Sequence, residues 1–212
     1  MGKEKQKCLI ISAGDMEEDI QKKITINPCD FVIACDDGYR HCVKFGIKPD
    51  ILIGDFDSIK SQLPKDVETV KLNCEKDDTD TISAIKFALK KGFKSIVLTG
   101  ALGGRIDHSF ANIASLLFIN SNGAYGEIIG DSERIFLIQN EEIVLQSEPN
   151  YTLSIFTPDE IAVGVCLKNV KYELEEYTMT NNFPIGISNE FTENDAIISV
   201  REGRLLVFLS QK

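Results

Sequence analysis

Short apolar runs alternate with amphipathic segments along the first 139 residues of the chain. The apolar runs are typical of buried strands, and apolar residues at helical spacing between them are typical of helices. Such an alternation predicts a mostly parallel sheet with helices on both faces. The predicted strands cover residues 7–12, 31–35, 51–53, 67–72, 95–99, 126–130 and 134–138. The predicted helices cover residues 16–24 and 39–45, a segment from the acids at 77–80 to about residue 91, and a largely apolar segment to about residue 120, which we expect to be buried.

The pattern changes after residue 139, where no convincing helical stripe is present and short alternating runs are separated by polar turns. This pattern is typical of a small all-β sandwich. The predicted strands cover residues 143–146, 151–157, 161–167, 171–174, 185–188, 196–200 and 205–209. The predicted fold class is therefore α/β, with an N-terminal mostly parallel α/β/α sandwich at 1–139 and a C-terminal all-β sandwich domain at 140–212.

Composition narrows the choice of partners and compartment. The formal net charge of −10 argues against a nucleic-acid partner, because such binding depends on Lys and Arg that neutralise phosphates. No apolar run approaches the roughly 20 residues of a membrane helix, so no membrane partner is expected. Residues 1–7 lack the apolar core of a signal peptide, and the six cysteines have no C-x-x-C spacing. We therefore expect a cytoplasmic protein with reduced thiols.

Two acidic clusters are candidates for a metal site. Asp55 and Asp57 directly follow a strand that ends at Gly54, and a second cluster, Asp77 to Asp80, begins a predicted helix. An acidic turn explains the first cluster equally simply, and helix capping explains the second. Taken together, the acids exceed what capping needs, and both clusters are expected at one rim of the sheet. Carboxylates of this kind are ligands for Mg²⁺, which completes its shell with water and substrate phosphate.

The segment Gly100 to His108 is a glycine-rich turn before a helix. Its backbone N–H groups are able to bind phosphate, and Arg105 adds a positively charged guanidinium group. It matches neither the Walker pattern nor G-x-G-x-x-G. A tight strand–helix turn capped by Asp107 is an equally good interpretation. We interpret both histidines, His41 and His108, as hydrogen-bonding or packing residues rather than bases.

Several motifs in chain order together resemble the thiamine pyrophosphokinase family, of the bacterial type. The combination is specific although each fragment alone is not, and it spans residues 36 to 190. It consists of Asp37-Gly38, Pro49-Asp50, Gly54-Asp55-Phe56-Asp57-Ser58, Lys76-Asp77-Asp78-Thr79-Asp80, Gly103-Gly104-Arg105-Ile106-Asp107-His108, residues 167–174 and Ile187-Ser188-Asn189-Glu190.

The resemblance implies transfer of the pyrophosphoryl group of ATP to the hydroxyl of thiamine, which gives thiamine diphosphate and AMP. It implies Mg²⁺ on Asp55, Asp57 and Asp80, and a homodimer with thiamine at the subunit interface. The catalytic set would be Asp55, Asp57, Asp80, Arg105 and Asp107, with either Asp80 or Asp57 accepting the hydroxyl proton. The nucleotide would lie against Asp37, Gly38, Asp77, Thr79, Gly103, Gly104, Arg105 and His108.

On the thiamine side, the resemblance implies contacts from Tyr172, Ser188 and Asn189 of the partner subunit's β domain. Pattern alone would make Tyr172 a core residue and the Ser-Asn pair a turn. Many relatives have tryptophan near Tyr172, so the stacking contact is the point at which this chain departs from the family. A thiazolium ring carries a fixed positive charge, and an aromatic face attracts it.

Three other functions fit parts of the pattern. A glycosyltransferase also uses an Asp-x-Asp pair on a divalent metal, and Asp55-Phe56-Asp57 satisfies that spacing. An aspartyl phosphatase requires D-x-D-x-T directly after an apolar strand, whereas Asp78-Thr79-Asp80 follows a polar stretch. A non-catalytic nucleotide-binding or thiamine-binding module would keep the same pocket and show no turnover.

Overall fold

The computed structural model describes residues 6–18, 20–56, 64, 66–73 and 77–212. The chain divides into two compact units, Met1–Asp131 and Ser132–Lys212. The division comes earlier than the domain boundary expected at 139/140, because the strand over residues 133–139 pairs within the second unit. No helix in the described part of the chain is long and apolar enough to span a membrane.

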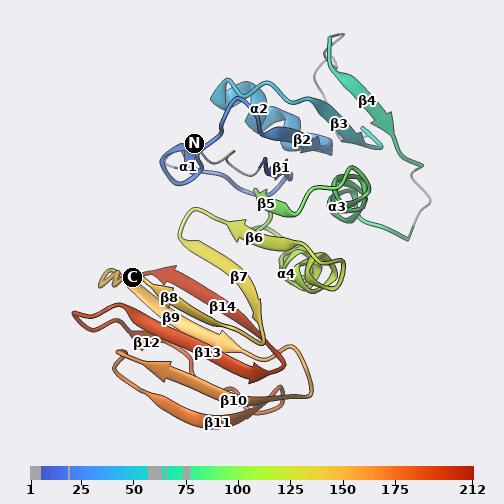
Figure 1. Ribbon diagram of the computed structural model, residues 1–212. Helices are drawn as coiled ribbons and strands as arrows, with labels where there is room; N and C mark the ends of the chain where they lie inside the picture. Colours follow the sequence, from blue (N-terminus) through green and yellow to red (C-terminus); the bar gives the residue numbers. More distant parts are fainter. Residues whose placement is uncertain (1–5, 19, 57–63, 65, 74–76) are drawn as a thin grey trace. The chain divides into compact units, whose positions relative to one another are not determined.

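The first unit is built on a parallel sheet with the strand order β6-β5-β1-β2-β3-β4 (Figure 1). Each neighbouring pair in this series runs parallel, as predicted. The central strands are buried along their whole length because helices cover them. The strands are β1 (Cys8–Ile11), β2 (Phe31–Cys35), β3 (Ile51–Gly54), β4 (Glu68–Lys71), β5 (Ser95–Thr99) and β6 (Tyr125–Ile129).

Helices follow the strands, mostly where the periodicity predicts them. They are α1 (Ile20–Lys23), the short 3-10 helix η1 (Asp36–Gly38), α2 (Tyr39–Phe45), α3 (Asp80–Lys90) and α4 (Ile106–Ser121). Gly46 ends α2 in the left-handed conformation, and Thr79 caps α3 through its hydroxyl. On one face of the sheet, Leu9 and Ile11 of β1 pack with Ile20 of α1 and Cys42 of α2.

Two helix predictions need correction. Among the described residues of the predicted helix over 16–24, only the four residues of α1 are helical, and the Glu17 N–H donates to the Asp131 carboxylate. Helix α4 is not buried as expected, since Phe110 and Ile106 are 73% and 86% exposed. Only Ser115, Leu116 and Ile119 of α4 are buried. One side of this apolar helix is therefore uncovered within the chain.

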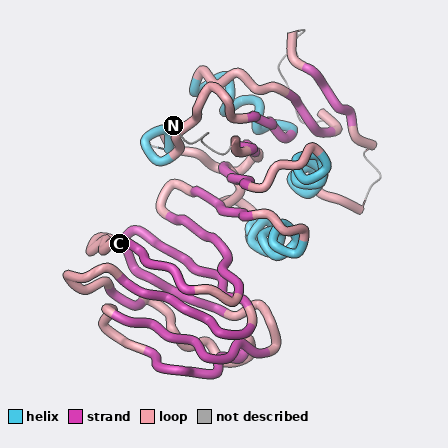
Figure 2. Tube along the Cα trace, viewed as in Figure 1, coloured by secondary structure: helices cyan, strands magenta, loops and turns pink. Residues whose placement is uncertain are grey.

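The second unit is an antiparallel sandwich of two sheets, ordered β12-β9-β14-β7 and β11-β10-β13-β8. Its core is formed by the inward residues of both sheets, including Leu153, Val165, Ile198 and Val207. Figure 2 shows strands and loops without a helix over residues 132–212, all of which are described. The strands are β7 (Glu133–Gln139), β8 (Glu142–Leu145), β9 (Tyr151–Phe156), β10 (Ile161–Lys168), β11 (Leu174–Thr180), β12 (Asn189–Glu190), β13 (Ala196–Glu202) and β14 (Arg204–Gln211).

The α/β unit followed by a β sandwich confirms the predicted fold class, with three differences in the strands. Strand β7, predicted to complete the parallel sheet, runs antiparallel to β14. Strand β11 lies mostly after the predicted 171–174, because it is an edge strand with largely exposed side chains and no clear apolar alternation. The segment 185–188 is a loop in which Gly186 and Ser188 have positive φ.

Candidate functional site

A pocket of about 650 Å³ lies in the first unit, where β1, β2 and β5 end and α3 and α4 begin. The carboxyl ends of parallel strands are the usual ligand site of such a sheet. The sequence-predicted residues that line it are Thr79, Asp80, Gly103, Gly104, Arg105, Asp107 and His108. Lining residues that sequence reasoning did not single out for the site include Ser12, Ala13, Gly14, Asp15 and Asn112.

One wall of the pocket consists of two interlocked turns: residues 12–15, here called the β1 turn, and residues 100–104, the β5 turn. The Ser12 N–H donates to the Thr99 carbonyl at 2.8 Å, and the Gly14 N–H donates to the Gly100 carbonyl at 2.7 Å. A Cβ on Gly14 would lie 2.5 Å from the Gly100 oxygen, closer than any side chain tolerates. The glycines therefore allow two backbones to meet, and Ala-Gly-Asp after the first strand was the available signal.

The start of α3 forms a second wall. Thr79 accepts the N–H of Ile82 at 3.2 Å and so begins the helix, which leaves Asp80 half-buried in the pocket lining. The buried hydroxyls of Ser12 and Thr81 lie 3.0 Å apart and join β1 to this helix. An eleven-residue helix that points its amino end at a pocket favours an anionic ligand there.

The β5 turn leads to an exposed ion pair at the start of α4. Both Gly103 and Gly104 have positive φ, at 86° and 63°. The Arg105 guanidinium donates to the Asp107 carboxylate at 3.1 and 2.5 Å. The hydrogen bond from Arg105 lowers the pKa of Asp107, which stays ionised at neutral pH. Arg105, rather than Asp107, is the N-cap residue, and its side chain makes no capping bond, so this feature is not explained as a cap.

The acidic residues in the pocket lining are Asp15, Asp36, Asp78, Asp80 and Asp107. Asp78 is paired with Lys86 at 2.6 Å. In the described residues, no group of three His, Cys, Asp or Glu side chains is arranged to hold a metal ion. The half-buried Asp36 and Asp80 nevertheless line one cavity, which suits Mg²⁺, since this ion needs only one or two protein carboxylates beside phosphate and water.

Of the two predicted metal ligands among the described residues, Asp55 and Asp80, Asp80 lines the pocket. Asp55 is half-buried directly after β3 and is not among the lining residues. Asp57 lies outside the described residues. The predicted ligand set of Asp55, Asp57 and Asp80 therefore stays a prediction.

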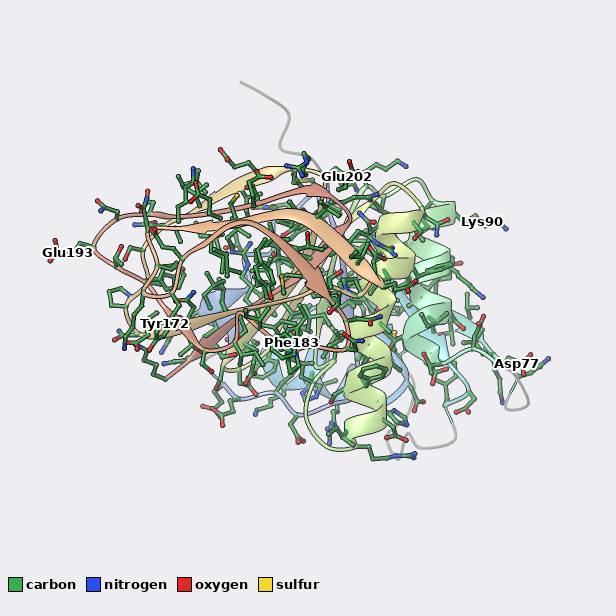
Figure 3. The ribbon with its side chains drawn as sticks, turned by 90° about the horizontal axis from the view of Figure 1, so that it is seen from below. Asp77, Lys90, Tyr172, Phe183, Glu193 and Glu202 are labelled. Carbon is green, nitrogen blue, oxygen red and sulfur yellow. The ribbon has the colours of Figure 1, made fainter. Side chains whose placement is uncertain are left out.

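Three residues predicted to contact the nucleotide are not among the residues that line the pocket. Asp37 pairs with Arg40 at 3.2 Å. Gly38 is buried against β1, where a Cβ would meet the Ile11 carbonyl at 2.2 Å, so its glycine identity has a packing reason. Asp77 is exposed in the loop before α3 (Figure 3).

In the second unit, Tyr172 and Asn189 are joined by their hydrogen bonds. The Asn189 side chain is 1% exposed, accepts the Tyr172 N–H at 2.9 Å and donates to the Tyr172 carbonyl at 2.7 Å. Tyr172 itself is 61% exposed rather than in the core (Figure 3). Ser188 is exposed, and its N–H donates to the Ser154 hydroxyl. Asn189 thus shapes the Tyr172 loop, while Tyr172 and Ser188 are open to a ligand.

Comparison with known proteins matches two family models to the chain. Residues 23–125 match "Thiamin pyrophosphokinase, catalytic domain", and residues 140–205 match "Thiamin pyrophosphokinase, vitamin B1 binding domain". Thiamine pyrophosphokinase of Bacillus subtilis is 29% identical over 184 residues, which is 84% of this chain and 86% of the relative. Thiamin pyrophosphokinase 1 of Caenorhabditis elegans is 27% identical over 190 residues, 81% of this chain and 76% of the relative.

Solved structures share the fold. The crystal structure of thiamine pyrophosphokinase from Bacillus subtilis superposes with a TM-score of 0.89 at 24% identity and covers 98% of this chain and 100% of its own. Thiamin pyrophosphokinase from Candida albicans gives a TM-score of 0.74 at 15% identity, over 98% of this chain and 89% of its own.

Proposed function

The chain belongs to the thiamine pyrophosphokinase family, and we propose that it transfers the pyrophosphoryl group of ATP to the hydroxyl of thiamine, giving thiamine diphosphate and AMP. The observation that carries the proposal is the 650 Å³ pocket, in which the start of α3, the glycine-rich β5 turn and several carboxylates meet. Backbone N–H groups at the start of a helix bind the negatively charged phosphates of a nucleotide. Carboxylates nearby hold the Mg²⁺ ion that accompanies those phosphates.

In this proposal, ATP lies along the wall formed by the β1 and β5 turns. The phosphates meet the N–H groups of the β5 turn and of the start of α3, close to Thr79. Asp80 and Asp36 would hold Mg²⁺, together with Asp55 and Asp57 of the predicted set, and the ion would neutralise charge on the phosphates. The hydrogen bond to Asp107 orients the Arg105 side chain, and Arg105 lines the pocket with its guanidinium charge.

The transfer is a displacement at the β-phosphorus. The thiamine hydroxyl oxygen forms the new bond, the bond from the β-phosphorus to the oxygen bridging it to the α-phosphorus breaks, and AMP leaves with that oxygen. The hydroxyl proton goes to a carboxylate, and Asp80 or Asp57 is the candidate. Phosphoryl transfer of this kind depends on positioning and charge stabilisation more than on covalent chemistry.

We place thiamine against Tyr172 and Ser188 of a partner subunit, in a homodimer. Tyr172 presents an exposed ring to a cationic thiazolium, a contact worth roughly 0.5–2 kcal/mol. The uncovered residues Ile106 and Phe110 on α4, and Phe183 and Ile187 in the second unit, support an interface, since large exposed apolar side chains often mark one. A cytoplasmic location is part of the same proposal.

Product analysis tests the reaction. The purified chain is incubated with Mg²⁺-ATP, with and without thiamine, and the products are separated by chromatography. Thiamine-dependent AMP together with thiamine diphosphate is the expected result. ADP with thiamine monophosphate would instead identify a simple kinase, and absence of turnover would favour a binding module.

A further inference from the structure

His41 is a buried polar residue to which the proposed reaction assigns no role. It lies on α2 and is 4% exposed. Its Nε2 atom is 2.7 Å from the Gly14 carbonyl oxygen, so Nε2 carries the proton and donates. Nδ1 is buried and has no hydrogen-bond partner among the described residues, so a second proton on the ring would have no acceptor there. The ring stacks on Phe45, with centroids 6.1 Å apart and planes 10° from parallel.

The acceptor of this hydrogen bond belongs to the pocket wall. Gly14 lines the pocket, and its N–H donates to the Gly100 carbonyl of the β5 turn. Both backbone polar groups of Gly14 are therefore used, one toward α2 and one toward the β5 turn. Arg40, the residue before His41, donates to the neighbouring Ala13 carbonyl at 3.0 Å. Helix α2 thus contacts two consecutive carbonyls of the β1 turn, and the hydrogen bond from His41 is the less exposed of the two.

We propose that His41 is a positioning residue for the nucleotide, because its Nε2–H holds the β1 turn in the place where it interlocks with the β5 turn. Gly14 has no side chain of its own, so its place in the turn depends on its two backbone hydrogen bonds, one to the Gly100 carbonyl and one from His41. Loss of the donor would leave a carbonyl without its partner and let the wall move. The consequence for ATP rests on the proposed function, whereas the hydrogen bond itself does not.

The first test is spectroscopic and needs no substrate. In ¹⁵N-labelled protein, the His41 ring is expected in the neutral Nε2–H form. In His41→Leu, which removes the donor, faster amide exchange is expected at Gly14, whose N–H bonds to the β5 turn. An Nδ1–H ring in the unaltered protein, or unchanged Gly14 exchange in His41→Leu, would overturn the proposal. If His41→Leu does not fold, the protonated nitrogen of the His41 ring in the unaltered protein, Nε2 or Nδ1, still tests the proposal.

The second test separates positioning from general packing through three variants. A single hydrogen bond of this kind is worth about fivefold to tenfold in affinity, so His41→Leu is expected to raise KM for ATP by about that factor. KM for thiamine and kcat should stay within about twofold. His41→Gln keeps a donor and should recover most of the ATP affinity. Phe45→Leu removes the stacked ring but leaves His41 and Gly14, and serves as the matched control.

An equal rise in KM for ATP in His41→Leu and Phe45→Leu would overturn the proposal, as would no rise in His41→Leu. Failure of the proposed function has a different signature, since the unaltered protein would then form no thiamine-dependent AMP. In that case the ring form and the Gly14 exchange rate still decide the role of His41.

Discussion

The two units build their ligand-facing surfaces in different ways. In the first unit the pocket wall is largely backbone, with Gly14 and Gly100 in direct contact and polar groups fixed by strands and helix starts. In the second unit the candidate surface consists of exposed side chains on loops, including Tyr172. The buried Asn189 side chain accepts the Tyr172 N–H and so holds this loop. At Gly14 and Gly100 this backbone wall has no room for a Cβ, whereas a side chain on a loop can be replaced at moderate cost. Substitutions in the two units should therefore differ in the size of their effect and in the property that they change.

The largest effect is expected from Gly100→Ala. Gly100 has φ of 60°, and a Cβ there would lie 2.5 Å from the Ser12 carbonyl oxygen. We expect the variant to lose measurable activity and to unfold at lower urea concentration. Gly46→Ala is the matched control, because φ is 64° and no atom lies within 4 Å of the added Cβ. It should lose only about 1–2 kcal/mol in the free energy of unfolding and keep its activity. Equal damage in both variants would refute the interlocked wall.

Removal of a pocket carboxylate should follow in size. Asp80→Asn keeps the shape of the α3 start and removes a charge that lines the pocket. By analogy with losing one electrostatic contact to a transition state, kcat should fall by about 10²–10³-fold. Asp57→Asn is expected to abolish AMP formation with the fold retained. Rates are measured by AMP release and folding by circular dichroism, and undiminished activity would remove the aspartate from the mechanism.

A moderate effect is expected on the thiamine side. Tyr172→Ala removes an exposed ring, so KM for thiamine should rise by about 2–30-fold, the range of a cation–π contact, with stability unchanged. Asn189→Ala removes a buried side chain with three backbone partners and should cost about 1–3 kcal/mol of stability as well. Urea unfolding and thiamine titration separate the two. A stability loss in Tyr172→Ala would contradict the description of Tyr172 as a surface contact.

The smallest effect is a pH dependence of stability. Burial lowers the pKa of His41 below 6.5, helped by the cations Arg40 and Lys44 and opposed by the Gly14 hydrogen bond and Asp37. Between the lowered pKa and 6.5 the unfolded chain binds more protons, so stability falls as pH falls through this window. Urea midpoints at pH 7.5 and 5.5 should therefore differ less in His41→Gln than in the unaltered protein. An identical shift in both would mean that His41 does not contribute.

Local patterns predicted much of the first unit. Strands β2 and β5 and helix α2 have their predicted bounds, because continuous apolar runs and the Gly46 stop signal act locally. Prediction was poorer where the position of a strand depends on which other strand it pairs with. Strand β7 has the apolar run of a buried strand, and only its antiparallel pairing with β14 places it in the second unit.

The same division holds for the site. Gly103, Gly104 and Arg105 were found because a glycine-rich turn before a helix is visible in sequence, and they line the pocket. Ser12 and Gly14 were missed, since Ala-Gly-Asp is an ordinary turn sequence. The burial of Asn189 could not be read either, because it depends on hydrogen bonds to Tyr172, which is 17 residues away.

The sequence by itself determined the α/β unit, the β sandwich and, through its combined motifs, the family, because periodicity and motif spacing are properties of contiguous residues. Only the tertiary structure decided which turns meet. Gly14 and Gly100 are far apart in the chain, yet a Cβ on Gly14 would meet the Gly100 carbonyl oxygen, and a Cβ on Gly100 would meet the Ser12 carbonyl oxygen. His41 gains its partner from the turn of another strand. Contacts of this kind depend on how strands and helices pack, and no local pattern encodes them.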